Sequence, residues 1–484
     1  MPSIRIADLT FAYGGDESIF NNVSLQIETT WRTGLIGRNG RGKTTLLQLL
    51  SGNLEYSGTI SSPLPFEYFP YAVNDKHTQT IAVVRQLADF DDWQLERELS
   101  LLEADEKILQ RTFDTLSGGE QTKVLLAALF LKSGTHFLLI DEPTNHLDTE
   151  GRRILGNYLK RKSGFLLVSH DRSLLDNCVD HILSLNRSDI ELLKGNFSTW
   201  QQKREYHDKF EQAVNEKLRK DIKQLQKSAQ QTAAWSDKTE QTKYGSGRVD
   251  TGYIGAKSAK MMQRSVSLQT RQQKSIEEKA ALFQNSEIDE PLKLSPLQFH
   301  SGRLLEIDDL TVQYNDKPLF EHLTFSVNAG ERIALCGKNG CGKSCLLKLI
   351  VNRRTEGVRV PPQLKISYVP QDASFLSGNM RTFIEERQID EPLFKAILCK
   401  FGFDKNRFDE EMSALSAGQK KKILLSASLC ERAHLYLWDE PLNYIDVLSR
   451  IQIEKAFINS GAALLFVEHD AAFLEAVAAK RVML

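Results

Sequence analysis

Gly37-Arg38-Asn39-Gly40-Arg41-Gly42-Lys43-Thr44 is the stretch of sequence that decides the fold. An apolar run at 31–36 precedes it, and a helical pattern at 44–50 follows it. In a phosphate-binding loop of this spacing, the glycines let successive backbone N–H groups face the phosphates, and the helix N-terminus adds a favourable potential. We therefore expect a strand at 31–36, a helix at 44–50 and a phosphate-binding loop between them.

Four such blocks occur twice in the chain, each time in the same order. The loop returns as Gly337-Lys338-Asn339-Gly340-Cys341-Gly342-Lys343-Ser344. The other three pairs are Leu116–Glu120 with Leu415–Gln419, Asp141-Glu142-Pro143 with Asp439-Glu440-Pro441, and Ser169-His170-Asp171 with Glu468-His469-Asp470. Such a repetition of phosphate-site motifs predicts a tandem pair of ATP-binding domains.

Each half alternates strand-like and helix-like patterns, so we expect an α/β fold with a mostly parallel sheet. Compact apolar runs are typical of strands buried on both faces. They lie at 137–140, 165–168, 332–336, 435–438 and 464–467. We place the two ATP-binding domains at 1–196 and 301–484, and a linker at 197–300.

The linker differs in character from the two halves. No Pro or Gly occurs from 198 to 233, and apolar residues recur there at helical spacing. They are Phe210, Val214, Leu218, Ile222 and Leu225. A second apolar stripe runs from 262 to 283, with a glycine-rich stretch at 235–255 before it. We expect a long α-helical hairpin, in which about 36 residues of helix extend about 50 Å.

Positive charge concentrates in this linker. Residues 201–280 contain 17 Lys and Arg against 10 Asp and Glu, a net charge of +7, whereas the whole chain has a net charge of −1. A solvated helical face is the plain alternative, but the sign of the charge together with Trp235, Tyr244, Tyr253 and the glycines favours a nucleic-acid surface. The candidate RNA-binding residues are Lys243, Arg248, Tyr253, Lys257, Lys260 and Arg264.

Composition excludes several other classes of protein. The chain has 484 residues, 41% of them hydrophobic and 26% charged, as in ordinary soluble proteins. The longest apolar runs, such as 124–131, are far shorter than the roughly 20 residues of a membrane span. The start has no secretory pattern, and the six cysteines show no CxxC spacing. We therefore expect a cytoplasmic protein without a membrane domain and without zinc.

The two loops indicate how ATP and Mg²⁺ would be held. Lys43 and Lys343 would bridge the β- and γ-phosphates, and the hydroxyls of Thr44 and Ser344 would ligate Mg²⁺. An accidental glycine turn is the alternative for one such loop, but the strand before it and the helix after it argue against that.

The acidic blocks supply the catalytic candidates, because each follows an apolar strand. Asp141 and Asp439 can hold the metal ion or its water, and the next residue in each half can polarise the attacking water. A histidine follows the next strand in both halves and is placed to sense the γ-phosphate. The catalytic candidates are Glu142, Glu440, His170 and His469.

The Leu116-Ser117-Gly118-Gly119 block and its repeat resemble the signature motif of ABC ATPases. The D-loops at 145–148 and 443–446 extend this resemblance. In that family each ATP lies between the Walker motifs of one domain and the signature of the other. The implied nucleotide-binding residues are Tyr13, Gly37, Asn39, Gly40, Gly42, Lys43, Thr44, Thr45, Ser117, Gly118, Gly119, Tyr314, Gly337, Asn339, Gly340, Gly342, Lys343, Ser344, Cys345, Ser416, Ala417 and Gly418. The implied Mg²⁺ ligands are Thr44, Asp141, Ser344, Gln371 and Asp439.

Two ABC domains joined by a basic hairpin resemble the ABC-F family, whose members are ribosome-bound translation factors. The stretch at 438–444 and the glycine-rich linker resemble its antibiotic-resistance branch of the Lsa and Vga type. The resemblance implies a monomer with an intramolecular ABC dimer that binds the 70S ribosome, contacting 23S rRNA and P-site tRNA. It also implies that the linker enters the tRNA exit site and protects the peptidyl-transferase centre from lincosamides, pleuromutilins and streptogramin A.

Three other functions remain open at this point. A housekeeping ABC-F factor that relieves stalled or idle ribosomes would have the same motifs. The twin ATPase subunit of a membrane importer needs only a modest linker, and a DNA-repair ATPase with tandem ABC domains usually carries zinc modules. The long basic linker and the missing CxxC pairs count against the last two.

Two departures from the repeat predict unequal ATP sites. Tyr71 stands where the second half has the Q-loop glutamine Gln371, and Ala417 replaces a glycine of the signature. Because composite sites combine the two halves, both departures fall at the nucleotide held by Lys43. We expect that site to hydrolyse ATP more slowly.

Overall fold

We describe the protein from a computed structural model. The described residues are 2–14, 18–145, 147–186, 190–207, 209–210, 213–214, 217, 220–224, 227, 292–314, 317–338, 340–353 and 356–484. The chain divides into two compact units, one made of Met1–Trp200 with Pro291–Leu484 and the other of Gln201–Glu290. Most of the second unit, including the expected hairpin tip and all six RNA-binding candidates, lies outside the described residues.

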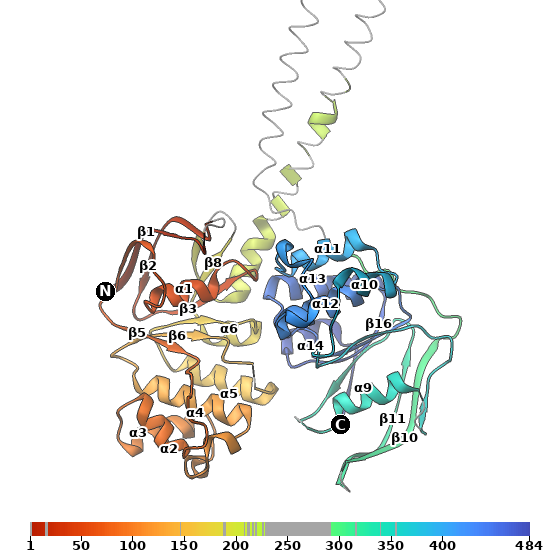
Figure 1. Ribbon diagram of the computed structural model, residues 1–484, viewed down its shortest axis with the longest axis horizontal. Helices are drawn as coiled ribbons and strands as arrows, with labels where there is room; N and C mark the ends of the chain where they lie inside the picture. Colours follow the sequence, from red (N-terminus) through yellow and green to blue (C-terminus); the bar gives the residue numbers. More distant parts are fainter. Residues whose placement is uncertain are drawn as a thin grey trace, which may run out of the picture. The chain divides into compact units, whose positions relative to one another are not determined.

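A six-stranded sheet forms the centre of the first half, with the order β5-β6-β7-β3-β8-β9 (Figure 1). Its strands are β3 (Arg32–Gly37), β5 (Phe66–Phe69), β6 (Phe137–Asp141), β7 (Phe165–Val168), β8 (His181–Leu185) and β9 (Ile190–Lys194). All neighbours are parallel except β8 and β9. The predicted strands at 31–36, 137–140 and 165–168 are confirmed within one residue.

The helices of the first half connect these strands. They are α1 (Lys43–Leu50), α2 (Thr80–Leu87), α3 (Asp92–Leu101), α4 (Gly118–Leu131), α5 (Thr149–Lys160) and α6 (Arg172–Cys178), with short helices at Glu106–Gln110 and Phe113–Thr115. Crossover helices between parallel strands bury both faces of a sheet. Every residue of β7 is accordingly buried.

The second half repeats this plan in a five-stranded parallel sheet of order β14-β15-β16-β12-β17. The strands are β12 (Arg332–Cys336), β14 (Ile366–Val369), β15 (Leu435–Asp439), β16 (Ala463–Val467) and β17 (Lys480–Met483). The helices are α9 (Lys343–Asn352), α10 (Met380–Glu386), α11 (Glu391–Lys400), α12 (Ala417–Cys430), α13 (Val447–Ser460) and α14 (Ala471–Val477), with short helices at Lys405–Arg407 and Met412–Ala414. The predicted strands at 332–336, 435–438 and 464–467 are confirmed.

Each half also has a three-stranded antiparallel sheet that was not predicted from the sequence. The first contains β1 (Ser3–Phe11), β2 (Phe20–Glu28) and β4 (Ser57–Ser61), and the second β10 (Arg303–Tyr314), β11 (Lys317–Asn328) and β13 (Val358–Arg359). Register shifts interrupt β1 and β10 near Asp8 (φ 53°) and Asp309 (φ 49°). Such bulges break the two-residue periodicity by which strands are found in a sequence.

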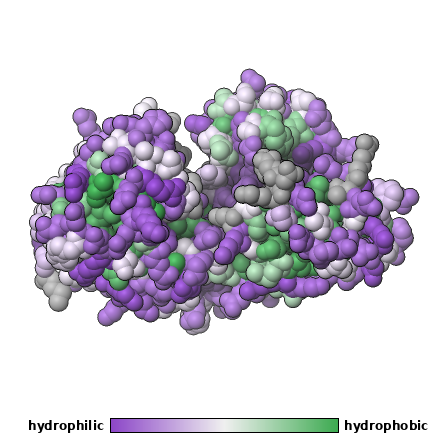
Figure 2. Space-filling view, turned by 90° about the horizontal axis from the view of Figure 1, so that it is seen from below, coloured by the Kyte–Doolittle hydropathy of each residue, from purple (hydrophilic) through white to green (hydrophobic). Residues whose placement is uncertain are grey.

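Hydrophobic side chains pack against both faces of each central sheet, and the described residues form four buried hydrophobic clusters. The largest fully buried side chain is that of Trp438 on β15. The face in Figure 2 is largely hydrophilic, with smaller hydrophobic areas. Among the described residues, no helix is long and apolar enough to cross a membrane.

Candidate nucleotide sites

The first loop runs from the end of β3 to the start of α1. Gly40 (φ 81°) and Gly42 (φ 85°) adopt left-handed conformations that glycine tolerates without strain. At Gly42 a Cβ atom would lie 2.6 Å from the Cγ2 atom of Ile19. Lys43 Nζ donates to the carbonyl oxygens of Gly37 at 2.8 Å and Arg38 at 3.2 Å. The loop therefore curves around the amine that the sequence assigns to phosphate binding.

The acidic block of the first half lies beside this loop. Asp141 ends β6, and its Oδ2 atom accepts hydrogen bonds from Thr44 Oγ1 at 2.9 Å and Tyr68 Oη at 3.2 Å. Glu142 follows with φ 48°, and its Oε1 atom lies 3.5 Å from His170 Nε2. The structure thus brings a metal-ligand candidate and two catalytic candidates together at the ends of β6 and β7.

Burial controls the charges of these groups. Desolvation, with the negative charge of Asp141 adding to it, raises the pKa of Glu142 to about 7. Burial, followed by the positive charge of Lys43, lowers the pKa of His170 well below its ordinary value. The histidine is therefore neutral at pH 7 and can donate from only one ring nitrogen.

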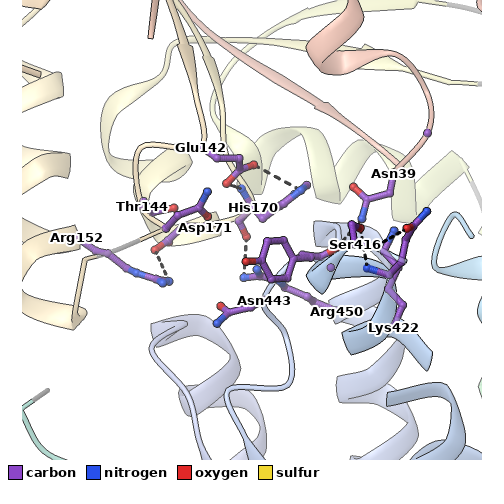
Figure 3. A pocket seen from close by; sticks show the side chains of 15 residues that line it. Asn39, Glu142, Thr144, Arg152, His170, Asp171, Ser416, Lys422, Asn443 and Arg450 are labelled. Atoms are coloured by element: carbon purple, nitrogen blue, oxygen red, sulfur yellow. Dashed lines mark hydrogen bonds and ion pairs between the residues drawn. The ribbon is translucent and has the colours of Figure 1, made fainter. Parts of the chain in front are cut away.

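A cavity of about 360 Å³ joins residues of the two halves (Figure 3). Asn39, Glu142 and His170 line it from the first half, and Ser416 and Gly418 line it from the second. The two halves also bond directly across it, because Asn39 N donates to Asp446 Oδ2 at 3.3 Å and Asn39 Nδ2 donates to Tyr444 O at 2.7 Å. The cavity combines Walker residues of one half with signature and D-loop residues of the other.

A neighbouring cavity of about 370 Å³ continues the first site toward Tyr13. Lys43, Thr44, Thr45 and Asp141 line it as well. The Tyr13 ring is 45% exposed, and its hydroxyl lies 3.3 Å from Thr45 Oγ1. An exposed aromatic ring beside a phosphate loop can stack on a nucleotide base.

Both signature motifs begin helices through the same capping arrangement. The hydroxyl of Ser117 accepts a hydrogen bond from the backbone N–H of Glu120, and Ser416 does the same with Gln419. In return, the side-chain oxygen of Glu120 or Gln419 accepts a hydrogen bond from the backbone N–H of the serine. Helices α4 and α12 therefore start at the signature, where their N–H groups favour an anion. Ala417 lies on the first turn of α12, between the cavity-lining residues Ser416 and Gly418.

The second half places its own candidates in the same way. Lys343 Nζ donates to Gly337 O at 2.8 Å, and His469 Nε2 lies 3.4 Å from Glu440 Oε1. Burial favours protonation of Glu440, but hydrogen bonding and the charge of His469 prevail and lower its pKa to about 2. Asn339 and the side chain of Tyr314 lie outside the described residues.

The structure separates the two residues at the Q-loop position. Gln371 lines a cavity of about 610 Å³ with Ser344, and Ser344 Oγ lies 3.5 Å from Gln371 Oε1. The Tyr71 ring instead packs against the hydrophobic core, with Phe69 edge-on at 6.5 Å and Lys132 Nζ 5.8 Å from its centre. Tyr71 thus stands at the Q-loop position but packs away from the nucleotide-site cavities.

Three residues around these sites were missed by sequence reasoning. Tyr68 bonds Asp141, as described above. Lys421 on α12 is 3% exposed and donates to Pro370 O at 2.6 Å and Asp439 O at 2.9 Å. Arg450 on α13 is 6% exposed and bonds both halves. The repeat contained a signal for Arg450, because Arg152 stands at the matching distance after the first D-loop.

Comparison with protein families agrees with this geometry. A family model described as "ABC transporter" matches residues 20–145 and 320–443. These two ranges contain both phosphate loops, both signatures and both acidic blocks.

Two relatives match nearly the whole chain. Ribosome protection protein VmlR of Bacillus subtilis (strain 168) is 31% identical over 470 residues, which span 95% of this chain and 83% of that protein. Erythromycin resistance ATP-binding protein MsrA of Staphylococcus epidermidis is 29% identical over 480 residues, which span 92% and 90%.

A solved structure shares the fold at lower identity. It is the complex of the archaeal ribosomal stalk protein aP1 with the archaeal ribosome recycling factor aABCE1. The TM-score is 0.61 at 20% identity, and the match covers 98% of this chain and 87% of that chain. At this identity the likeness shows the fold.

Proposed function

The chain belongs to the ABC-F family of ABC ATPases, and on that premise we propose that it is an ATP-driven ribosome protection protein. Two relatives that match almost its full length bear the names ribosome protection protein and erythromycin resistance protein. ABC domains bind ATP, so both halves of this chain are ATP-binding domains. In this proposal ATP acts as a conformational timer, because closure over the nucleotide and its hydrolysis favour different states of the protein.

The observation that carries this proposal is the cavity shared by the two halves (Figure 3). Asn39 of the first phosphate loop contacts the second D-loop, and Ser416 of the second signature faces the same space as Glu142. A nucleotide there would touch both halves at once, so its binding energy would favour their closed arrangement. Its hydrolysis would remove part of that energy and release the halves.

We propose matching roles for the duplicated residues. Lys43 and Lys343 bind the β- and γ-phosphates, Glu142 and Glu440 polarise the attacking water, and the switch histidines His170 and His469 position that water against the γ-phosphate. Each histidine lies within 3.5 Å of its glutamate, which supports this pairing.

The donor set fits Mg²⁺, which prefers oxygen ligands and several waters. Both carboxylate oxygens of Asp439 are buried without a hydrogen-bond partner among the described residues. The Thr44 hydroxyl donates to Asp141 at 2.9 Å, and the Ser344 hydroxyl lies 3.5 Å from Gln371 Oε1. When bound, Mg²⁺ would neutralise charge on the phosphates. We assign it to Thr44 and Asp141 in one half, and to Ser344, Gln371 and Asp439 in the other.

The linker, at 197–300, is where we propose that the ribosome is contacted. Its net positive charge supports binding to 23S rRNA and P-site tRNA in the tRNA exit site. The proposed RNA contacts are Lys243, Arg248, Tyr253, Lys257, Lys260 and Arg264. Through this segment the protein would protect the peptidyl-transferase centre from lincosamide, pleuromutilin and streptogramin A antibiotics, as in the Lsa and Vga type.

Expression in a drug-sensitive host tests this function. We expect raised resistance to lincomycin, tiamulin or virginiamycin M, with the Glu142→Gln/Glu440→Gln variant giving none because it cannot complete hydrolysis. Ribosome binding is measured in parallel by co-sedimentation. Binding without any resistance would replace this proposal with a housekeeping ABC-F factor that relieves stalled ribosomes.

Deleting the segment from Tyr244 to Ile254 tests the role of the linker separately. We expect the deletion to abolish resistance while ATP hydrolysis by the purified protein persists, because the described nucleotide-site residues lie outside the segment. Resistance that survives the deletion would refute the assignment of drug protection to this part of the linker.

A further inference from the structure

A buried arginine in the second half makes four hydrogen bonds. Arg450 Nε donates to Ile445 O at 3.0 Å, and Nη2 donates to Leu442 O at 3.0 Å. Its Nη1 atom donates to Asp470 Oδ2 at 2.9 Å and to His170 O at 3.0 Å. The side chain is only 6% exposed, so this guanidinium is held in one orientation by fixed acceptors.

The four acceptors come from both ATP sites. Ile445 belongs to the second D-loop, Leu442 directly precedes that loop, and Asp470 directly follows the switch histidine of the Lys343 site. His170, in contrast, is the switch histidine of the Lys43 site and belongs to the other half (Figure 3). One planar group therefore contacts the switch segments of both sites.

We propose that Arg450 is a positioning residue for ATP hydrolysis at the Lys43 site, acting from the opposite half of the chain. In this role Arg450 does not contact the reacting atoms. Its guanidinium hydrogen-bonds the backbone carbonyl oxygen of His170 and thereby fixes the position of that residue. That backbone carries the imidazole whose Nε2 atom lies 3.5 Å from Glu142 Oε1. This inference rests on the proposed ATPase function and assigns the control of one of its sites.

The contact is one-sided, although the repeat would allow two. Arg152 holds the matching place on α5, where it donates to Leu147 O at 3.1 Å and Asp171 Oδ2 at 3.4 Å. Between the described atoms of Arg152 and His469 we find no hydrogen bond. Among the described atoms, Arg152 therefore does not bond His469 in the way that Arg450 bonds His170.

A second buried pair reinforces the same side. Arg172, two residues after His170, donates through Nη1 to Glu454 Oε2 at 3.1 Å, and both side chains are under 10% exposed. The matching positions in the repeat are Ala471 and Gly156, which cannot form an ion pair. Buried ion pairs contribute little net stability but fix geometry, because breaking one leaves an uncompensated charge. Arg172 and Glu454 therefore hold α6 against α13, next to Arg450.

The test measures ATP hydrolysis at the Lys43 site alone, because Glu440→Gln inactivates the Lys343 site. In a Glu440→Gln background, we compare Arg450→Lys with the matched variant Arg152→Lys, measuring kcat and KM for ATP. A lysine keeps the charge but cannot reach four acceptors with a planar group. We expect Arg450→Lys to lower kcat about tenfold with KM within about twofold, and Arg152→Lys to lower kcat by at most about threefold.

The possible outcomes separate a positioning role from a structural one. Equal losses in the two variants, or a loss confined to KM, would overturn the proposal. If Arg450→Lys does not fold, the double variant Arg172→Ala/Glu454→Gly replaces the buried ion pair with the residues found at the matching positions of the repeat. This variant should lower kcat at least about threefold without changing KM. An unchanged kcat in that variant would also overturn it. Failure of the ATPase function is recognised separately, as absence of hydrolysis in the parent protein.

Discussion

At the scale of single residues, the two proposed ATP sites differ in the hydrogen bonds made by the aspartate that we propose as a metal ligand. Asp141 accepts a hydrogen bond from Tyr68, whereas Asp439 has two buried oxygens without a partner among the described residues. The tyrosine is duplicated, because Tyr368 stands at the matching place on β14, but its buried hydroxyl also has no described partner. The same residue pair is therefore bonded in one half and unbonded in the other.

Replacing each tyrosine with phenylalanine should expose this difference. Tyr68→Phe removes a hydrogen bond to a carboxylate and should lower the free energy of unfolding by about 1–2 kcal/mol. Tyr368→Phe removes a buried hydroxyl that has no partner, so the change should stay within about 0.5 kcal/mol. Denaturant unfolding of the nucleotide-free protein measures both. Equal destabilisation by the two variants would contradict the hydrogen-bond assignment.

Asp180 gives a pH-dependent contribution to stability at the start of β3. It accepts hydrogen bonds from Arg32 N at 3.1 Å and Arg32 Nε at 2.9 Å, and His181 Nδ1 lies at 2.7 Å. Burial alone would raise its pKa, but the bonds from His181 and Arg32 prevail and lower it. A lowered folded-state pKa stabilises the protein above the unfolded-state pKa, and this stabilisation is lost as the pH falls through the folded-state value.

Asp180→Asn should therefore lower the free energy of unfolding by about 1 kcal/mol at neutral pH. This value is small because Asp180 and Arg32 are partly exposed to solvent. The difference in the free energy of unfolding between variant and parent should stay constant from pH 7 to 5 and become smaller below about pH 4. Unfolding curves at several pH values measure it. A difference that narrows already between pH 7 and 5 would contradict the assignment of the effect to Asp180.

At the scale of elements, the turn after α11 approaches the first phosphate loop very closely. Gly402 has φ +70°, and a Cβ atom there would lie 2.6 Å from the carbonyl oxygen of Asn39. The contact is between backbones of different halves, so neither side can move away by a rotamer change. The matching residue in the repeat is Glu103 (φ 49°), which shows that the first half tolerates a side chain there.

Gly402→Ala should therefore disturb the Lys43 site beyond the cost of its backbone conformation. Gly378→Ala is the matched control, because Gly378 has φ +81° and no atom within 4 Å of its would-be Cβ. In the Glu440→Gln background we expect Gly402→Ala to reduce kcat/KM at least about fivefold and Gly378→Ala to change it less than about twofold. Similar values for the two would mean that left-handed strain alone explains the loss.

Sequence alone predicted the elements that lie between duplicated motifs. Strands β3, β6 and β7 of the first central sheet and β12, β15 and β16 of the second were predicted, because short apolar runs next to the duplicated motifs have few alternatives. The other strands of these sheets were not predicted. The antiparallel sheets were missed because bulges at Asp8 and Asp309 interrupt their alternation. Tyr68 and Lys421 were missed for another reason: their partners are backbone or acidic groups brought close only by the fold.

At the scale of the whole molecule, the duplication produces two sites that share residues but not surroundings. The Lys43 site has a tyrosine bonded to its aspartate, a Q-loop residue packed into the core and an arginine of the other half on its switch histidine. The Lys343 site keeps Gln371 near Ser344. If both sites hydrolyse ATP as we propose, each difference changes the surroundings of a proposed catalytic residue, and we therefore expect different turnover rates at the two sites.

We expect the Lys43 site to be the slower one, because no described glutamine occupies its Q-loop position and Tyr71 packs away from the cavity. Glu440→Gln leaves the Lys43 site active, and Glu142→Gln leaves the Lys343 site active. Loss of one positioning hydrogen bond corresponds to roughly tenfold in rate, so Glu440→Gln should retain about a tenth of the turnover that Glu142→Gln retains. Steady-state phosphate release measures both, with Glu142→Gln/Glu440→Gln as the background. Equal residual rates would mean that the sites are functionally equivalent despite their different surroundings, and that Tyr71 and Ala417 do not set the rate.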